Sequence, residues 1–345
     1  MVMNFQAKQQ ILLTGAGFTH NFGGFLAEQF WAELLNKLSL INHIRIVKLL
    51  KQDEGFDFEH VYSLVMNVAS YDDDQRKGLQ SAVRQCFSEM HEILKAWDSR
   101  SHGYRIDRAL LDNGFLRRFV GDPYPKNPGF IFTTNQDLFL EMHGGFGAYD
   151  NIIPGVSPPN GDRWFLGGGS TSSISLKGAD IPSKDAIEAR VSKDLGTAGL
   201  HYVKLHGSCN WYYPDGLERM ILGYGKQQQI QADPLLSSYH QIFREVLCSD
   251  NRKLLVIGYG FRDRHINNVL IEAIKDHSLE LYVLSPMNPR AFKNYLFSVV
   301  SKKQLRAETI WDGIEGYFPY RLAELFPTAE RPSRAVAQII KVLGL

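Results

Sequence analysis

Four short motifs of the chain combine glycine with side chains that could bind a nucleotide and act on it. They are TGAGFT at 14–19, TTNQD at 133–137, KLHGS at 204–208 and GYGFRD at 258–263. Each of them ends an apolar run that is typical of a buried strand. A glycine turn can approach a pyrophosphate closely, an amide can hold ribose hydroxyls or a water molecule, and an imidazole can act as a base near neutral pH. These are residue types that binding and attacking a dinucleotide would require.

In the first motif, Gly15 and Gly17 would let the backbone turn sharply where a strand ends. The N-terminus of the following helix would then offer free N–H groups and the positive end of its dipole. The pattern is not a complete GxGxxG, because His20 stands at the position of the third glycine, and Gly23 and Gly24 come later. Glycine-rich turns also occur in folds that bind no nucleotide, so both interpretations stay open for this motif alone.

The next two motifs carry the candidate reactive side chains. Asn135 is suited to holding ribose hydroxyls or an attacking water, and Asp137 could accept a hydrogen bond from a carboxamide NH₂. The alternative is that both residues cap a helix, a common role for Asn and Asp after a strand. His206 is followed by Gly207, which would leave the imidazole uncrowded as a general base. The alternative is a structural histidine.

The last motif places Gly258 and Gly260 at another strand end, where the backbone could contact a phosphate or a ribose. Asp263 is in position to cap the helix that follows. After a further strand, Ser285 in the sequence LSP could line an adenosine pocket, although a plain turn explains it equally well.

These motifs require a parallel sheet to bring them together. Apolar runs predict strands at 10–14, 130–134, 202–205, 253–258 and 279–284. Helical segments separate them, as parallel pairing requires. The predicted fold class is therefore α/β, a Rossmann-like doubly wound parallel sheet. In such a sheet, ligands bind outside the carboxyl ends of the strands, where the motifs lie.

Three segments extend this sheet. Apolar residues at helical spacing predict helices within 25–38, 41–50, 58–70, 79–94 and 106–119, and we interpret 25–125 as a helical insertion subdomain. The stretch 144–200 is rich in glycine, proline and serine, and we expect a long loop or lid there. Residues 289–345 are expected to form a C-terminal helical extension that ends in an amphipathic helix at 335–342.

Composition limits the function classes. The chain has 345 residues, 44% of them hydrophobic, which suggests two domains or one large domain with an insertion. The formal net charge is +1, so we expect no direct nucleic-acid binding. No apolar stretch is long enough for a membrane span and no signal peptide is recognisable. The three cysteines, Cys86, Cys209 and Cys248, form no CxxC pair, which excludes a four-thiolate zinc site and fits a reducing cytoplasm.

The order of the motifs resembles the sirtuin family, and specifically its bacterial sirtuin-like branch that hydrolyses NAD. This resemblance implies that the first turn binds the pyrophosphate, with Thr19 in place of the usual serine. It implies that Asn135 contacts the nicotinamide ribose and its water, that Asp137 contacts the carboxamide and that His206 is the catalytic histidine. Gly260 departs from the serine common at its position. The predicted catalytic residues are Asn135, Asp137 and His206, and the predicted NAD-binding residues are Gly15, Ala16, Gly17, Phe18, Thr19, Thr134, Gly258, Gly260 and Ser285.

Two departures from the deacetylases of that family bear on the reaction. The chain cannot supply their four zinc-binding cysteines, and it has NFGGF at 21–25 in place of their Pro-Asp-Phe-Arg segment. Both differences count against lysine deacylation and leave NAD binding and cleavage as the expectation. We therefore expect residues 1–345 to form a sirtuin-like NAD-binding domain that uses NAD as its substrate and holds no metal.

The predicted function is a gated NAD glycohydrolase that cleaves NAD to nicotinamide and ADP-ribose, in bacterial anti-phage defence by NAD depletion. One alternative is a sirtuin-type deacylase or ADP-ribosyltransferase, and another is a non-catalytic NAD-binding subunit of a defence complex. An unrestrained NAD hydrolase would kill its cell, so we expect control by self-assembly into a homo-oligomer or by a separate partner. The resemblance suggests a HerA-type ATPase first, and Argonaute-like or nucleotide-processing proteins as alternatives.

Overall fold

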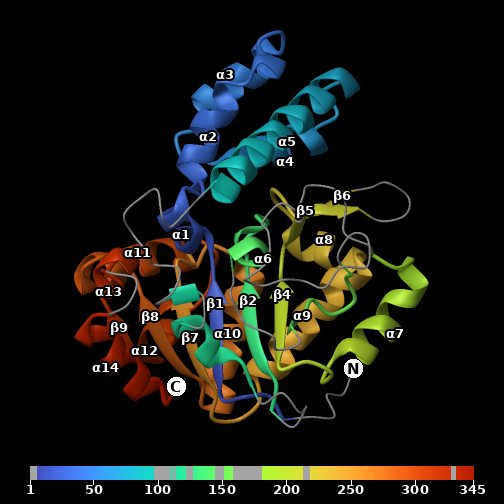
Figure 1. The fold of residues 1–345 in the computed structure, drawn as a ribbon. Coiled ribbons are helices and arrows are strands. Elements are labelled where there is room, and N and C mark those ends of the chain that lie inside the picture. The colour runs from blue at the N-terminus through green and yellow to red at the C-terminus, as the bar shows by residue number, and fades with distance from the viewer. Residues whose placement is uncertain are drawn as a thin grey trace.

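The fold is seen in a computed structural model, which describes residues 6–96, 110–111, 114–121, 127–143, 151–157, 181–212, 218–327 and 332–345. Its centre is a seven-stranded sheet with the order β3-β4-β2-β1-β7-β8-β9, in which every neighbouring pair is parallel (Figure 1). The strands are β1 (Gln10–Thr14), β2 (Gly129–Thr133), β3 (Asn151–Ile152), β4 (Leu200–Lys204), β7 (Lys253–Ile257), β8 (Glu280–Leu284) and β9 (Ile314–Phe318). A separate antiparallel pair consists of β5 (Gly207–Tyr212) and β6 (Glu218–Met220).

The sheet confirms the predicted fold class. All residues of β1, β2 and β4 are buried, as expected when helices cover both faces of a parallel sheet. The order β4-β2-β1-β7-β8-β9 is that of a Rossmann fold, in which the chain moves outward from β1 on one side and then returns to pair with β1 on the other. The five predicted strands correspond to β1, β2, β4, β7 and β8.

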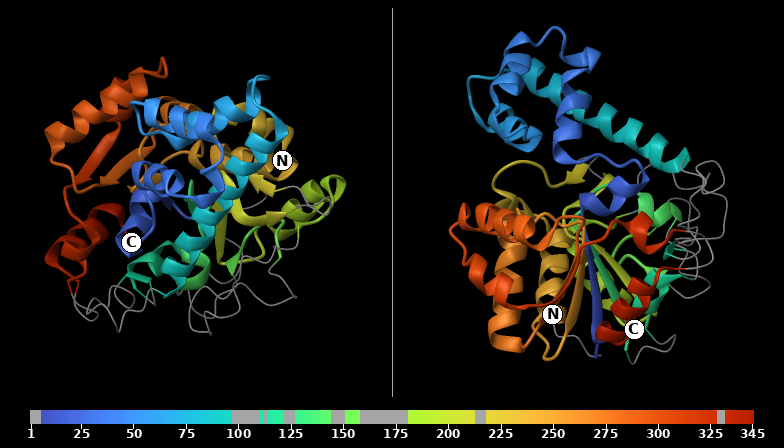
Figure 2. Two further views of the ribbon diagram at one scale, coloured as in Figure 1. Left: turned by 90° about the horizontal axis from the view of Figure 1, so that it is seen from above. Right: turned by 90° about the vertical axis from the view of Figure 1, so that its left-hand side faces the viewer.

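Helices form a layer on each side of the sheet (Figure 2). One layer contains α9 (Pro234–Leu247), α10 (Arg264–His277) and α12 (Ala307–Asp312), and the other contains η4 (Phe115–Phe119), α13 (Leu322–Leu325) and α14 (Arg334–Leu343). The remaining helices around the sheet are α1 (Ala16–Thr19), η1 (His20–Phe22), α6 (Phe139–His143), α7 (Lys184–Asp194), α8 (Lys226–Ala232) and α11 (Pro289–Ser301).

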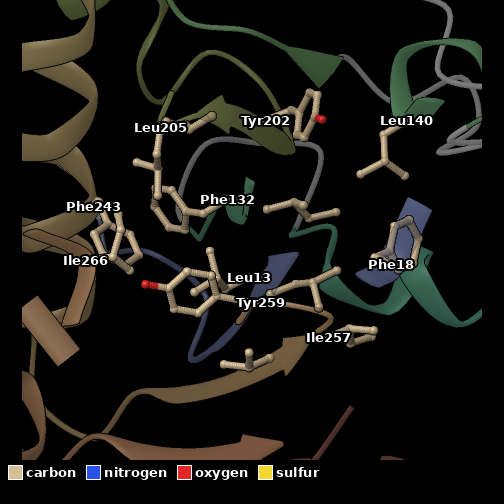
Figure 3. Close-up of a cluster of buried hydrophobic side chains, with 14 of the residues drawn as sticks. Leu13, Phe18, Phe132, Leu140, Tyr202, Leu205, Phe243, Ile257, Tyr259 and Ile266 are labelled. Carbon is tan, nitrogen blue, oxygen red and sulfur yellow. The ribbon is translucent and has the colours of Figure 1, made fainter. Parts of the chain in front are cut away.

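The core lies between the sheet and these layers. Figure 3 shows Leu13 of β1, Phe132 of β2 and Leu205, which follows β4, packed toward Phe243 of α9 and Ile266 of α10. The rings of Phe132 and Phe243 meet edge to face, with centroids 4.9 Å apart. This geometry is favourable for aromatic pairs, and it fixes α9 against the end of β2.

A group of helices rises beyond the edge at which the strands end (Figures 1 and 2). It consists of α2 (Ala27–Leu35), η2 (Leu38–Leu40), α3 (Ile44–Gln52), α4 (Phe58–Asn67) and α5 (Asp73–Ala96). Its own core includes Phe30, whose ring stacks on Phe58 at 4.2 Å and approaches Phe87 at 4.9 Å. These helices lie in the segment predicted as an insertion, whose limits of 25 and 125 stay a prediction because residues 97–109 and 122–126 lie outside the described residues.

Three parts of the chain differ from the expectation. The extension 289–345 was predicted to be helical but contains β9, whose sequence IEGYF is half exposed and gives a weak strand pattern at the edge of the sheet. The segment 144–200, predicted as a loop or lid, contains β3 and α7 in its described residues, while 144–150 and 158–180 lie outside them. Within 106–119, the described residues include the 3₁₀ helix η4. None of the helices in the described ranges is long and apolar enough to cross a bilayer.

Candidate functional site

The four motifs end the neighbouring strands β4, β2, β1 and β7, at the carboxyl edge of the sheet (Figure 1). The chain reverses its direction of travel across the sheet between β1 and β7, which makes this edge the topological switch point. Ligands of open α/β sheets bind at such a point. The topology therefore places the predicted residues where a ligand site is expected.

The glycine turns after β1 and β7 pack backbone against backbone. Gly15 donates its N–H to the carbonyl of Ile257 at 3.1 Å, and Gly17 donates to Gly258 at 3.0 Å. A Cβ at Gly258 would lie 2.1 Å from the nitrogen of Phe18, and Gly258 has a φ of 70°. The glycines are therefore required by this close approach of two turns, whether or not a ligand binds.

Gly258→Ala is expected to lower the free energy of unfolding by at least about 2 kcal/mol, because alanine is strained at this φ and its methyl group meets backbone. Urea denaturation measures the change. Gly55→Ala is the matched control, since the nearest atom to its Cβ would be 3.7 Å away. Equal stability of the two variants would contradict this interpretation.

Hydrogen bonds within and between the two turns use N–H groups that we expected a pyrophosphate to bind. Those of Gly15 and Gly17 are bonded to the turn after β7, and that of Phe18 is bonded to the carbonyl of Gly15 at 2.8 Å. The expected set of free N–H groups is thus smaller than predicted, and α1 is only four residues long. A phosphate bound here would have to use other donors, such as the N–H of Ala16 or the hydroxyl of Thr19.

Asn135 and Thr19 lie in direct contact although 116 residues separate them. The Asn135 amide donates to the Thr19 hydroxyl at 3.2 Å, and the backbone nitrogen of Asn135 donates to the Thr133 hydroxyl at 3.1 Å. Next to them, the nitrogen of Thr134 donates to the carbonyl of Thr14 at 3.1 Å. The TTNQD and TGAGFT motifs therefore form one hydrogen-bonded group.

Asp137 joins this group and also has a structural bond. Its carboxylate accepts from the N–H of Phe139 at 3.0 Å, at the start of α6. The side chain also interacts with Thr19. Burial raises the pKa of Asp137, and the positive charge of Lys204 opposes that rise. One oxygen of Asp137 therefore caps α6, as the alternative interpretation predicted. The interaction with Thr19 also places the Asp137 side chain beside the glycine turn that follows β1.

A buried ion pair supports this region, and sequence reasoning missed it. Lys204 at the end of β4 contacts the carboxylate of Glu141 in α6 at 2.6 Å, and their side chains are 0% and 1% exposed. The Lys204 ammonium also donates to the carbonyl of Asp137. The signal in the sequence was a lysine near the end of the run YVKL, which was predicted as a buried strand.

His206 is buried, not uncrowded as predicted. Its Nε2 lies 2.9 Å from Nε2 of His265, at the start of α10, and its side chain is about 3% exposed. Burial lowers the pKa of His206 well below its ordinary value, and it lowers that of His265 to about 4. Both rings are therefore neutral at physiological pH. His240 of α9 packs on His265 and bonds through its own Nε2 to the carbonyl of Leu205 at 2.9 Å.

Charged groups lie beside these histidines. An oxygen of Asp263 is 3.9 Å from Nε2 of His206 and 3.0 Å from the ammonium of Lys226, which also contacts Glu59 of α4 at 2.8 Å. Burial alone would raise the pKa of Asp263, but the positive charge of Lys226 holds it well below its usual range. Asp263 stands at the N-cap of α10 as predicted, yet within the described residues its side chain makes no capping bond. His265, Lys226 and Glu59 were not predicted, because they come from separate elements and have no motif spacing.

Two groups of side chains have spacings that a metal ion could use. The ligand atoms of His206, Asp263 and His265 lie within 4.8 Å of one another, as do those of Cys248, Glu272 and His277. In the first group, Lys226 already neutralises the carboxylate and would repel a cation. In the second group, Arg244 already binds Glu272, with an N···O distance of 2.9 Å. We assign no metal to either group.

The remaining predicted residues lie farther along the edge. The hydroxyl of Ser285 accepts from the N–H of Met287 at 3.3 Å, and the carbonyl of Gly260 accepts from the Tyr295 hydroxyl at 2.9 Å, next to α11. Within the described residues, no hydrogen bond joins Ser285 to the TTNQD or LHGS motif. Ser285 is thus placed at the strand end expected of an adenosine pocket, without a contact that tests it.

His206 and Asn135 lie in neighbouring turns, and no hydrogen bond between their side chains is found in the part of the chain that the structure describes. The carbonyl of Gln136 accepts from the N–H of Cys209 at 2.9 Å and from the Ser208 hydroxyl at 3.3 Å, so the two turns are bonded through their backbones. The side chains of Asn135 and His206 have separate partners, Thr19 and His265. Their convergence on one ligand stays a prediction.

Comparison with protein families gives one match. A model described as the SIR2-like domain matches residues 129–307, just over half of the chain. The matched region begins at β2 and includes the TTNQD, LHGS and GYGFRD motifs, while TGAGFT and helices α2 to α5 precede it. A search among curated proteins finds no match.

Proposed function

The chain belongs to the SIR2-like family, and on this basis we propose that it is an NAD glycohydrolase, which splits NAD into nicotinamide and ADP-ribose. Membership of the family supports an NAD-dependent enzyme in general. The glycohydrolase activity is our proposal, and so is its place in anti-phage defence by NAD depletion.

One contact carries the proposal, the hydrogen bond from the Asn135 amide to the Thr19 hydroxyl. It joins the glycine turn after β1 to the polar end of β2. A dinucleotide whose pyrophosphate lay near that turn would have its nicotinamide ribose within reach of the neighbouring strand ends. Asn135 and Thr19 are both buried, so their polar groups would meet such a ligand in a site of low dielectric constant, where hydrogen bonds are stronger.

The reaction requires little acid catalysis from the protein. Breaking the N-glycosidic bond gives an oxocarbenium-like ribosyl centre, and nicotinamide leaves readily because it is cationic in NAD. In our proposal, Asn135 positions the ribose and the attacking water, and Asp137 holds the carboxamide. His206 accepts a proton from the water or a ribose hydroxyl. Neutral His206 is in the correct state for this role at pH 7.

Water, not a peptide, is the acceptor we propose. A zinc-bound small domain of the deacetylase type would need four cysteines, and the chain has three, which are far apart in sequence. Burial raises the pKa of Cys86 and of Cys209 to about 12, which makes them poor thiolate ligands where they stand.

We propose that the activity is gated. The Lys226 ammonium connects Glu59, in the helices above the sheet, with Asp263 beside His206. A movement of α4 would therefore change the charge environment of the histidine. A homo-oligomer or a separate partner, with a HerA-type ATPase first among the candidates, would act through such a movement.

Incubating the full chain with NAD tests the proposal, with nicotinamide and ADP-ribose separated by chromatography and NAD affinity measured by calorimetry. We expect NAD binding and the release of nicotinamide and free ADP-ribose in equal amounts. Turnover only with a peptide acceptor would favour a transferase or deacylase. Binding without turnover, alone and in extracts of phage-infected cells, would favour a non-catalytic subunit. Absence of NAD binding would contradict the proposal.

A further inference from the structure

Two histidines share one hydrogen bond beside the predicted active site. His206 follows β4, His265 begins α10, and their Nε2 atoms are 2.9 Å apart. The family resemblance singles out His206 alone. The partner ring is itself held in place by His240 of α9, with ring centroids 5.0 Å apart.

The short distance between two neutral rings restricts where their protons lie. Of the two Nε2 atoms, one must carry the hydrogen and the other must accept it. If His265 donated, both nitrogens of His206 would be occupied, and His206 could not act as a base. If His206 donates, its Nδ1 keeps a free lone pair. Among the described residues, Nδ1 of His206 has no hydrogen-bond partner, which leaves it available to a substrate.

We propose that His265 receives the proton that passes through His206, so that the general base is a pair of imidazoles. This inference rests on the proposed NAD cleavage. In the reaction, Nδ1 of His206 takes a proton from the attacking water or a ribose hydroxyl, while the hydrogen on Nε2 of His206 moves to Nε2 of His265. His206 is neutral before and after this step, and His265 becomes an imidazolium. Because it acts through His206, His265 is a positioning residue.

A carboxylate beside the two rings would stabilise a positive charge on the pair, against the burial that lowers the pKa of His265 to about 4. An oxygen of Asp263 is 3.9 Å from Nε2 of His206, and the ligand atoms of Asp263 and His265 lie within 4.8 Å of each other, so one carboxylate is close to both rings. Lys226 of α8 opposes this, but its charge is shared between Asp263 and Glu59 of α4. His240 of α9 is neutral, because burial lowers its pKa to about 3. Passing the proton outward also keeps charge away from the oxocarbenium-like centre, where a second positive charge would be unfavourable.

The variant His265→Gln distinguishes a role of His265 in proton transfer from a role in hydrogen bonding alone. The glutamine side-chain oxygen can accept the bond from Nε2–H of His206, but it cannot take the proton. We expect both His265→Gln and His265→Ala to lower kcat for nicotinamide release at least about 30-fold, with KM within about threefold. The rise of kcat with pH should shift in both variants. His277→Gln, at the far end of α10, is the matched control and should retain full kcat. If His265→Gln keeps full kcat, the proton does not pass to His265 and the inference is wrong.

A second measurement does not depend on activity. In the full chain labelled with ¹⁵N-histidine, NMR should detect scalar coupling between Nε2 of His206 and Nε2 of His265 across the hydrogen bond. The one-bond coupling should place the proton on His206. A proton on His265, or no coupling, would overturn the inference. If the wild type binds NAD but releases no nicotinamide, the proposed function fails and the proton transfer with it, whereas the NMR result still decides whether His206 donates to His265.

Discussion

Asn135→Ala is expected to reduce kcat for nicotinamide release by at least about 100-fold while the protein stays folded. The variant loses the amide that we propose orients the ribose and water. It also loses the hydrogen bond to Thr19, whose contribution to stability is only about 1 kcal/mol. The Thr19 hydroxyl still donates a longer hydrogen bond to the carbonyl of Ala16, so it does not lose all of its hydrogen-bond partners. Chromatography of nicotinamide gives the rate, and circular dichroism during heating gives the midpoint of unfolding.

Two further variants make this prediction specific. Asn135→Asp has nearly the same shape but cannot donate to Thr19, and we expect it to be as inactive as the alanine variant. Asn67→Ala is the matched control, because the bonds of the Asn67 side chain within the described residues stay inside α4, to the carbonyl and hydroxyl of Ser63. Full activity in Asn135→Ala would mean that the amide takes no part in the reaction.

Lys204→Met is expected to lower the free energy of unfolding by about 3–5 kcal/mol, because it leaves the buried carboxylate of Glu141 without its partner. The double variant Lys204→Met with Glu141→Gln should recover much of this loss, since it removes both charges. Denaturant unfolding at pH 7 measures all three proteins. The control is Lys253→Met, because the 3.4 Å pair of Lys253 with Glu280 is partly exposed and should contribute no more than about 1 kcal/mol.

The loss in Lys204→Met should also depend on pH. Burial already raises the pKa of Glu141, and Lys204 opposes that rise, so removal of Lys204 raises the folded-state pKa further. A carboxyl with a raised folded pKa favours folding below its unfolded pKa and loses that contribution as pH rises through the folded value. The deficit should therefore shrink as pH falls from 8 toward 5. A constant deficit over this range would show that lost packing, and not charge, causes it.

The strands and the motifs that follow them could be predicted from the sequence because each depends on a few consecutive residues. Strands such as QILLT and GFIFT are wholly buried, so an unbroken apolar run identifies them. The position of TTNQD and LHGS at one edge of the sheet then follows from parallel pairing. The edge strand IEGYF has no such run, since only Phe318 is fully buried, and it was missed.

The surroundings of the predicted residues could not be read from their spacing. His206 looked uncrowded because Gly207 follows it, but His265, which is 59 residues away in sequence, fills the space beside it. Similarly, the glycines of the first turn were explained by a phosphate, whereas Gly258 accounts for their close packing. Such contacts depend on which helix covers which strand end. A single sequence does not carry that information.

A crystal structure of Asn135→Ala grown with NAD would test most directly whether one dinucleotide binds across these strand ends. Slow cleavage should leave the substrate intact in the crystal. We expect electron density for NAD with its pyrophosphate beside residues 15–19 and its nicotinamide ribose between residue 135 and His206. Density for NAD at any other place, or a closed site without NAD at saturating concentration, would contradict it.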